Sequence, residues 1–124
     1  TFAAVGYSGT ILTSSDNGTT WASRSSGTSK YLRRVTYGNS SFVTVGNGGT
    51  ILTSSDGTSW TSRSSGTSNN LNGITYGNST FVATFDSSST NPNRVTTSSD
   101  GKTWTQWDTP LIAEYLLWYI YRIM

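Results

Sequence analysis

The chain has no cysteine and no histidine among its 124 residues. Without cysteine it forms no disulfide and no thiolate site, and without histidine it lacks the commonest metal ligand and the usual general base at neutral pH. Charged residues make up only 11% of the sequence, whereas about a quarter is typical. The eight Lys and Arg are scattered and the net charge is +2, so we expect no nucleic-acid partner. We predict no cofactor and no metal site.

A phrase of Ser, Asp, Gly and Trp occurs three times in the chain. Its copies lie at residues 14–21, 54–60 and 98–104. The spacing of Phe2, Phe42 and Phe81 repeats with nearly the same period. Self-similarity at a fixed period of about 20 to 50 residues is typical of repeat architectures. The sequence therefore predicts tandem repeats.

Gly or Asn interrupts each repeat every few residues, which suits short strands and disfavours helices. In the second repeat we expect strands at residues 32–37, 41–45, 50–54 and 59–63. Four short antiparallel strands in about 40 residues are typical of a β-propeller blade. The predicted fold class is therefore all-β, with about 2.75 blades in the chain.

The predicted blades divide the chain into four parts. We expect a partial blade of three strands, without its first strand, at residues 1–30 and a complete blade at 31–68. A second complete blade at 69–108 carries a lengthened loop at 86–94, and a hydrophobic tail follows at 109–124.

The repeated phrase resembles the Asp-box, or BNR repeat, of sialidase-like propellers, whose pattern is Ser/Thr-x-Asp-x-Gly-x-Thr-Trp. The first copy, from Ser14 to Trp21, matches every position, whereas the other two lack one residue between Asp and Gly. The stretch from Val5 to Leu12 is similar to the Val-Gly-x-x-Gly-Thr-Ile stretch of photosystem II assembly factor-like propellers. The resemblance covers residues 1 to about 107. It implies a propeller fold whose Asp-boxes lie at the blade periphery and are not catalytic.

We interpret the phrase as a structural turn. Its Asp is expected to accept hydrogen bonds from backbone N–H groups two or three residues later, its Gly to adopt a left-handed conformation, and its Trp to be buried against the blade. The predicted turn anchors are Asp16, Gly18, Trp21, Asp56, Gly57, Trp60, Asp100, Gly101 and Trp104.

The sequence does not predict an enzyme. The resemblance to sialidases implies an arginine cluster, a tyrosine nucleophile and a glutamate, but the only Glu is Glu114 and the equivalent repeat positions Arg24 and Arg63 form no cluster in the sequence. Glycoside hydrolysis by paired carboxylates is disfavoured because three of the five Asp are turn anchors. A remnant of a glycoside hydrolase propeller stays a second alternative.

Positions that differ between nearly identical repeats are candidates for ligand binding. Tyr7 stands where the next repeat has Asn47, and residues 30–34 stand where the third repeat has mostly Asn and Gly. The candidates are Tyr7, Lys30, Tyr31, Arg33 and Arg34. A glycan, a phosphate or a protein would be the ligand, and a solvated turn that merely varies is the alternative.

The tail differs in composition from every repeat. Pro110 and Glu114 favour a helix, whereas alternating Tyr, Leu and Trp favour an added strand, and both stay open. The segment is shorter than the roughly twenty residues that span a bilayer, and contact with a membrane surface is not favoured. The candidate interface residues are Leu111, Tyr115, Leu116, Trp118, Tyr119 and Ile120.

Fewer than three blades cannot close a propeller, since these usually have about four to eight blades. We therefore expect a homo-oligomer. The predicted function is a non-catalytic structural or interaction module that self-assembles through its blades and tail, in an extracellular, surface or phage assembly. The alternative is a lectin-like propeller that binds carbohydrate.

Overall fold

The computed structural model describes residues 1–85 and 94–108. Their regular secondary structure consists of eleven β-strands and two short 3-10 turns, which form three antiparallel sheets. The all-β prediction is confirmed. The expected loop at 86–94, apart from Arg94 in β10, and the tail at 109–124 lie outside the described residues.

The first sheet has three strands in the order β1-β2-β3. They are β1 (Phe2–Val5), β2 (Ile11–Ser14) and β3 (Ala22–Arg24), and the 3-10 turn η1 (Tyr7–Gly9) joins the first two. Within the described residues no further strand pairs with β1, so β1 is an edge of its sheet.

The second sheet has four strands in the order β4-β5-β6-β7. They are β4 (Leu32–Gly38), β5 (Ser41–Gly46), β6 (Ile51–Ser54) and β7 (Thr61–Arg63), with the 3-10 turn η2 (Asn47–Gly49) between β5 and β6. The fourth strand begins two residues later than expected, because the amide of Ser59 donates to Asp56 in the preceding turn.

The third sheet has the order β8-β9-β10-β11. Its strands are β8 (Leu71–Gly77), β9 (Thr80–Phe85), β10 (Arg94–Ser98) and β11 (Thr105–Asp108). The register repeats from sheet to sheet: Phe2 pairs with Ser14, Phe42 with Ser54, and Phe81 with Ser98. β5 and β9 are therefore equivalent to β1, and β4 and β8 are the first strands of their sheets.

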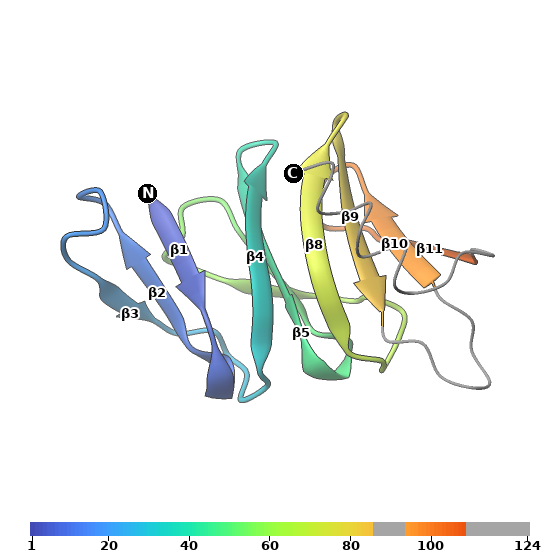
Figure 1. Ribbon diagram of the computed structural model, residues 1–124, viewed down its shortest axis with the longest axis horizontal. Coiled ribbons are helices and arrows are strands. Elements are labelled where there is room, and N and C mark those ends of the chain that lie inside the picture. Colours follow the sequence, from blue (N-terminus) through green and yellow to red (C-terminus); the bar gives the residue numbers. More distant parts are fainter. Residues whose placement is uncertain (86–93, 109–124) are drawn as a thin grey trace.

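The three sheets stand side by side in chain order, as Figure 1 shows, and form an open row rather than a closed ring in the described residues. Successive side chains of a strand point to opposite faces, so the second sheet contacts one neighbour with each of its two faces. We call the face that points to the preceding sheet the leading face; it carries Phe42 and Leu52 in the second sheet. The trailing face points to the next sheet and carries Val43 and Thr53 there.

Two apolar clusters fill the spaces between the sheets. Between the first and second sheets, Ile11 packs with Leu32 and Leu52. Between the second and third sheets, the cluster is larger and consists of Val43, Val45, Ile51, Leu71, Ile74, Phe81, Ala83 and Phe85. Trailing-face residues of one sheet thus pack against leading-face residues of the next.

Gly46 lies where another strand comes very close. Its backbone is extended, but a Cβ atom on it would lie 2.0 Å from the carbonyl oxygen of Tyr31, just before β4. The equivalent Gly6 has nothing within 4 Å of such a Cβ, since no first strand lies beside it in the described residues.

We predict that Gly46→Ala lowers the free energy of unfolding by about 1–3 kcal/mol, because the added methyl group overpacks a backbone contact. Gly6→Ala is the matched control and should change the stability by less than about 0.5 kcal/mol. Urea denaturation followed by circular dichroism measures both. Equal effects of the two substitutions would contradict the prediction.

Candidate functional site

The Asp residues of the repeated phrase hold turns through hydrogen bonds to the backbone. Oδ1 of Asp56 accepts from the amides of Thr58 and Ser59, at 2.8 and 3.0 Å. Oδ1 of Asp100 accepts in the same way from Lys102 and Thr103, at 2.8 and 3.0 Å. In each of these turns the Asp therefore orders the two or three residues that follow it.

The first turn differs from the expected geometry. Asp16 accepts from the amide of Thr20, four residues later, at 2.9 Å, and from the hydroxyl of Thr20 at 2.5 Å. The cause is the additional residue Asn17, which adopts φ 62° beside Gly18 at φ 83°. The copy that matches the family pattern at every position thus has the longer turn.

The serine of the phrase is a functional part of the turn that the sequence interpretation missed. Ser54 is buried; its hydroxyl donates to Asp56 at 3.1 Å and accepts from the amide of Gly57 at 2.8 Å. Ser14 and Ser98 make the equivalent pair of hydrogen bonds. The serine occurs two residues before the Asp in every copy of the phrase, and this repetition is the feature of the sequence that points to its role.

These hydrogen bonds stabilise the charged form of the Asp side chains. The hydroxyl and the amide of Thr20 lower the pKa of Asp16 from its ordinary value of 3.8 to about 2. The amides of Thr103 and Lys102 lower the pKa of Asp100 to about 2, and those of Ser59 and Thr58 lower the pKa of Asp56. An acid with a lowered pKa is ionised at neutral pH and is no general acid there.

The three Trp anchors have different surroundings. Each indole N–H donates to the carbonyl of the turn Gly, at 3.0, 2.9 and 2.8 Å. The rings of Trp60 and Trp104 lie 6.1 and 6.4 Å from Phe42 and Phe81, and both are half-buried. Trp21 is 44% exposed, so the expected burial is wrong for this copy. The first sheet has no preceding sheet among the described residues to cover its turn.

Three of the five candidate ligand-binding residues form one cluster. The rings of Tyr7 and Tyr31 are stacked, with centroids 4.2 Å apart and planes inclined by 18°. The guanidinium of Arg33 lies over Tyr31, 5.0 Å from the ring centroid, and its Nε donates to Asn47 Oδ1 at 2.6 Å. Tyr7 is 73% exposed. The cluster is therefore an aromatic and basic surface open to solvent.

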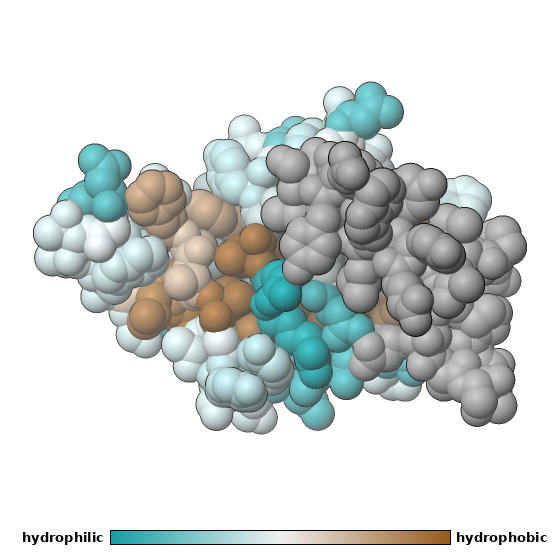
Figure 2. Space-filling model, viewed as in Figure 1, coloured by the Kyte–Doolittle hydropathy of each residue, from teal (hydrophilic) through white to brown (hydrophobic). Residues whose placement is uncertain are grey.

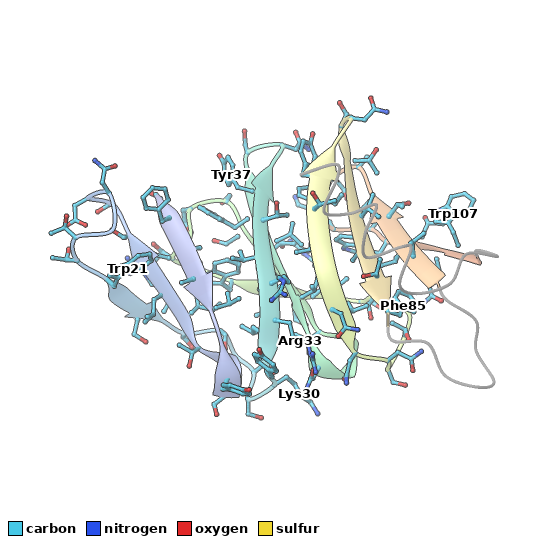
Figure 3. All side chains as sticks on the ribbon, viewed as in Figure 1. Trp21, Lys30, Arg33, Tyr37, Phe85 and Trp107 are labelled. Carbon is cyan, nitrogen blue, oxygen red and sulfur yellow. The ribbon has the colours of Figure 1, made fainter. Side chains whose placement is uncertain are left out.

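The turns η1 and η2 and the linker before β4 position this cluster. The amide of Asn47 donates to the carbonyl of Tyr31 at 2.9 Å, which joins η2 to the linker. Lys30 passes close to Gly48, because a Cβ there would lie 3.4 Å from its Cε. Figure 3 shows Lys30 and Arg33 at one end of β4 and Tyr37 at the other.

Arg34 does not share this surface. It is paired with Val45 in the sheet, and its Nη1 donates to the carbonyl of Arg33 at 2.9 Å. Arg33, by contrast, is the residue that the bulge between Leu32 and Arg34 leaves without a cross-strand partner. The adjacent pair in the sequence therefore contributes one guanidinium to the cluster.

The turn Asp residues are spread along the row of sheets. The turn anchors Asp16, Asp56 and Asp100 belong to three different sheets. No group of three or more acidic residues that could hold a metal occurs among the described residues. What the cluster offers is aromatic surface, a cation and hydrogen-bond donors, which suit binding.

Comparison with known proteins finds no matching family model, curated protein or solved structure. Residues 1–85 and 94–108 contain no helix that is long and apolar enough to cross a membrane. The candidate interface residues Leu111, Tyr115, Leu116, Trp118, Tyr119 and Ile120 lie outside the described residues.

The lowered pKa values predict a loss of stability in acid. In the folded protein the side chains of Asp16 and Asp100 stay ionised down to about pH 2, whereas in the unfolded chain they become protonated near pH 4. The free energy of unfolding therefore falls as the pH drops from about 4 to about 2. Melting temperatures measured by circular dichroism should be lower at pH 2 than at pH 4. Asp100→Asn, which cannot titrate, should reduce this dependence, and an unchanged dependence in the variant would refute the explanation.

Proposed function

We propose that the chain is a non-catalytic interaction module made of Asp-box propeller blades, and that copies of it assemble through the faces of their sheets. The support comes from a packing contact that occurs twice within the chain. A Cβ on Gly57 would lie 3.5 Å from Thr13 Cγ2 of the first sheet, and one on Gly101 would lie 3.2 Å from Val43 Cγ2 of the second. The second and third Asp turns thus lie against the trailing face of the sheet before them.

The first sheet presents the same leading face without a neighbour in the described residues. Phe2 is 54% exposed, whereas the equivalent Phe42 and Phe81 are 7% and 0% exposed. Leu12 is half-buried where the equivalent Leu52 is buried. The Phe ring that a neighbouring sheet covers in the second and third sheets is thus exposed to solvent in the first sheet, and this observation carries the proposal.

The third sheet presents the complementary trailing face. Val82 is half-buried, whereas Val43 at the equivalent position is fully buried. Trp107 is 55% exposed and its indole N–H donates to Thr97 at 2.9 Å, in the place where Arg63 donates to Thr53. A trailing face of one copy against the leading face of another would repeat the contact that exists twice within the chain.

Such an interface joins two different surfaces and is therefore heterologous. Heterologous contacts produce a ring when the rotation between copies closes and a filament when it does not. A closed propeller needs about four to eight blades, and the structure has three sheets. The proposed assembly therefore contains two or more copies.

Light scattering after size-exclusion chromatography tests the assembly. At micromolar concentration we expect a mass that is a multiple of the 13.4 kDa chain, and Phe2→Ser should shift it toward the single chain. The substitution should leave the free energy of unfolding of the chain nearly unchanged, because Phe2 is exposed. The matched variant Phe81→Ser removes a buried ring and should cost about 3–5 kcal/mol. A wild-type chain that stays monomeric would refute the proposal.

The stack of Tyr7 on Tyr31 favours carbohydrate binding as a second function. An exposed aromatic ring provides an apolar platform for the face of a sugar, and the Arg33 guanidinium beside it provides donors for hydroxyl or carboxylate oxygens. The two contributions lie on one surface, as a sugar-binding site requires.

A glycan array tests this second function. Tyr7→Ala should weaken binding of any glycan that the wild-type chain retains by roughly tenfold, because it removes the exposed ring of the stack. Tyr37→Ala removes an exposed ring at the other end of β4 and is the control that should retain binding. Equal binding by both variants would mean that the glycan binds at another site than Tyr7. If the wild-type chain binds no glycan on the array, carbohydrate binding is excluded.

A further inference from the structure

A groove lies between the free edge of β1 and the second sheet. It encloses about 180 Å³ and is lined by Phe2 and Ala3 on one side and by Val35, Tyr37 and Phe42 on the other. Figure 2 shows hydrophobic residues gathered between β1 and β4 on this side of the molecule. We infer that this groove accepts an extended peptide strand with the sequence pattern of β4.

The next pair of sheets shows what fills the equivalent place. There, β4 is paired with β5 and packs against β8 of the third sheet. Ile74 of β8, which faces β4, is 2% exposed, whereas its equivalent Val35 in β4 is only half-buried. The same position is thus covered when a first strand is present beside it and open when that strand is absent from the described residues.

The contact of Tyr76 with Gly38 specifies one residue of the incoming strand. A Cβ on Gly38 would lie 2.2 Å from Cγ of the Tyr76 ring, so the ring packs directly on the glycine backbone. Tyr37 is the equivalent of Tyr76 and is 57% exposed. The strand that covers Tyr37 therefore needs a glycine at the position of Gly38.

The other end of the groove shows the same relation. The carbonyl oxygen of Tyr31 lies against Gly46, whereas the equivalent Gly6 has open space on that side. By the register of β4 on β5, the incoming strand would place its Tyr opposite Phe2 and its Leu opposite Gly6. Unpaired backbone groups along a sheet edge supply the hydrogen bonds for such strand addition.

The pattern distinguishes between possible occupants. A β4-type strand has Leu, a β-branched residue and Gly at the positions that the groove requires, as in Leu32, Val35 and Gly38. The tail at 109–124 contains no glycine. A segment with the sequence pattern of β4 and β8 is therefore the occupant that fits, and the tail is the alternative that the experiment tests.

The probe is a fluorescent synthetic peptide with the sequence of residues 31–40, titrated with the full chain and followed by anisotropy. We expect saturable binding of one peptide per chain. The same peptide with Gly38→Val should bind at least roughly tenfold more weakly, because its side chain would meet the Tyr37 ring.

Gly6→Ala in the chain tests the groove from the other side. Its methyl group would occupy the space that the incoming carbonyl needs, so the substitution should weaken peptide binding by roughly tenfold or more. In the chain without peptide, no atom lies within 4 Å of that methyl position. Circular dichroism checks that this variant stays folded.

Three outcomes would overturn the inference: no saturable binding, equal binding of the Gly38→Val peptide, or tighter binding of a peptide with the sequence of residues 111–124. Strand binding goes beyond the assembly proposed above. Peptide stoichiometry and particle mass are separate measurements, so a monomeric chain that binds the peptide would refute only the assembly.

Discussion

The second and third Asp turns of this protein pack their glycines against the trailing face of the sheet before them, and the arrangement of the row depends on that contact. The approach is close, since a Cβ on Gly101 would lie 3.2 Å from Val43 and 3.6 Å from Phe81. The backbone there is left-handed, at φ 78°, where glycine has no steric cost. The buried serine and the ionised Asp hold the turn in this shape. The phrase that repeats in the sequence is therefore both a turn and a sheet-to-sheet contact.

The repetition gives chemically equivalent residues different surroundings. Phe2, Phe42 and Phe81 have the same place in their sheets, but their exposure falls from 54% to 7% and 0% along the row. The difference comes from the neighbouring sheet and not from the residue itself. A row of sheets has two end faces, and their apolar side chains are the physical basis of the proposed assembly. The strand groove is a separate consequence of the same geometry, because it lies where a first strand would complete the first sheet.

Much of the local structure could be predicted from the sequence. Short runs of Val, Ile, Thr and Phe between Gly and Asn indicated strands, and those of the second repeat lie within two residues of their expected bounds. The turn at Asp16 was predicted less well, because Asn17 lengthens it and moves the accepted amide to Thr20. The role of the serine was missed, since a hydroxyl in a Ser-rich chain does not stand out in the sequence.

By itself, the sequence determined the repeat period and the short strands, because these depend on local backbone preference and on the alternation of side chains. It also determined the candidate ligand-binding residues, because these are positions that differ between repeats. Only the tertiary structure decided which of those candidates meet. Tyr7 and Tyr31 are 24 positions apart, in the turn η1 of the first sheet and in the linker before β4, and the fold brings their rings together. Arg33 joins them while Arg34 does not, because Arg33 lies at a bulge whereas Arg34 is paired with Val45 in the sheet. Burial was likewise decided by position in the row, since identical residues differ only in what packs against them.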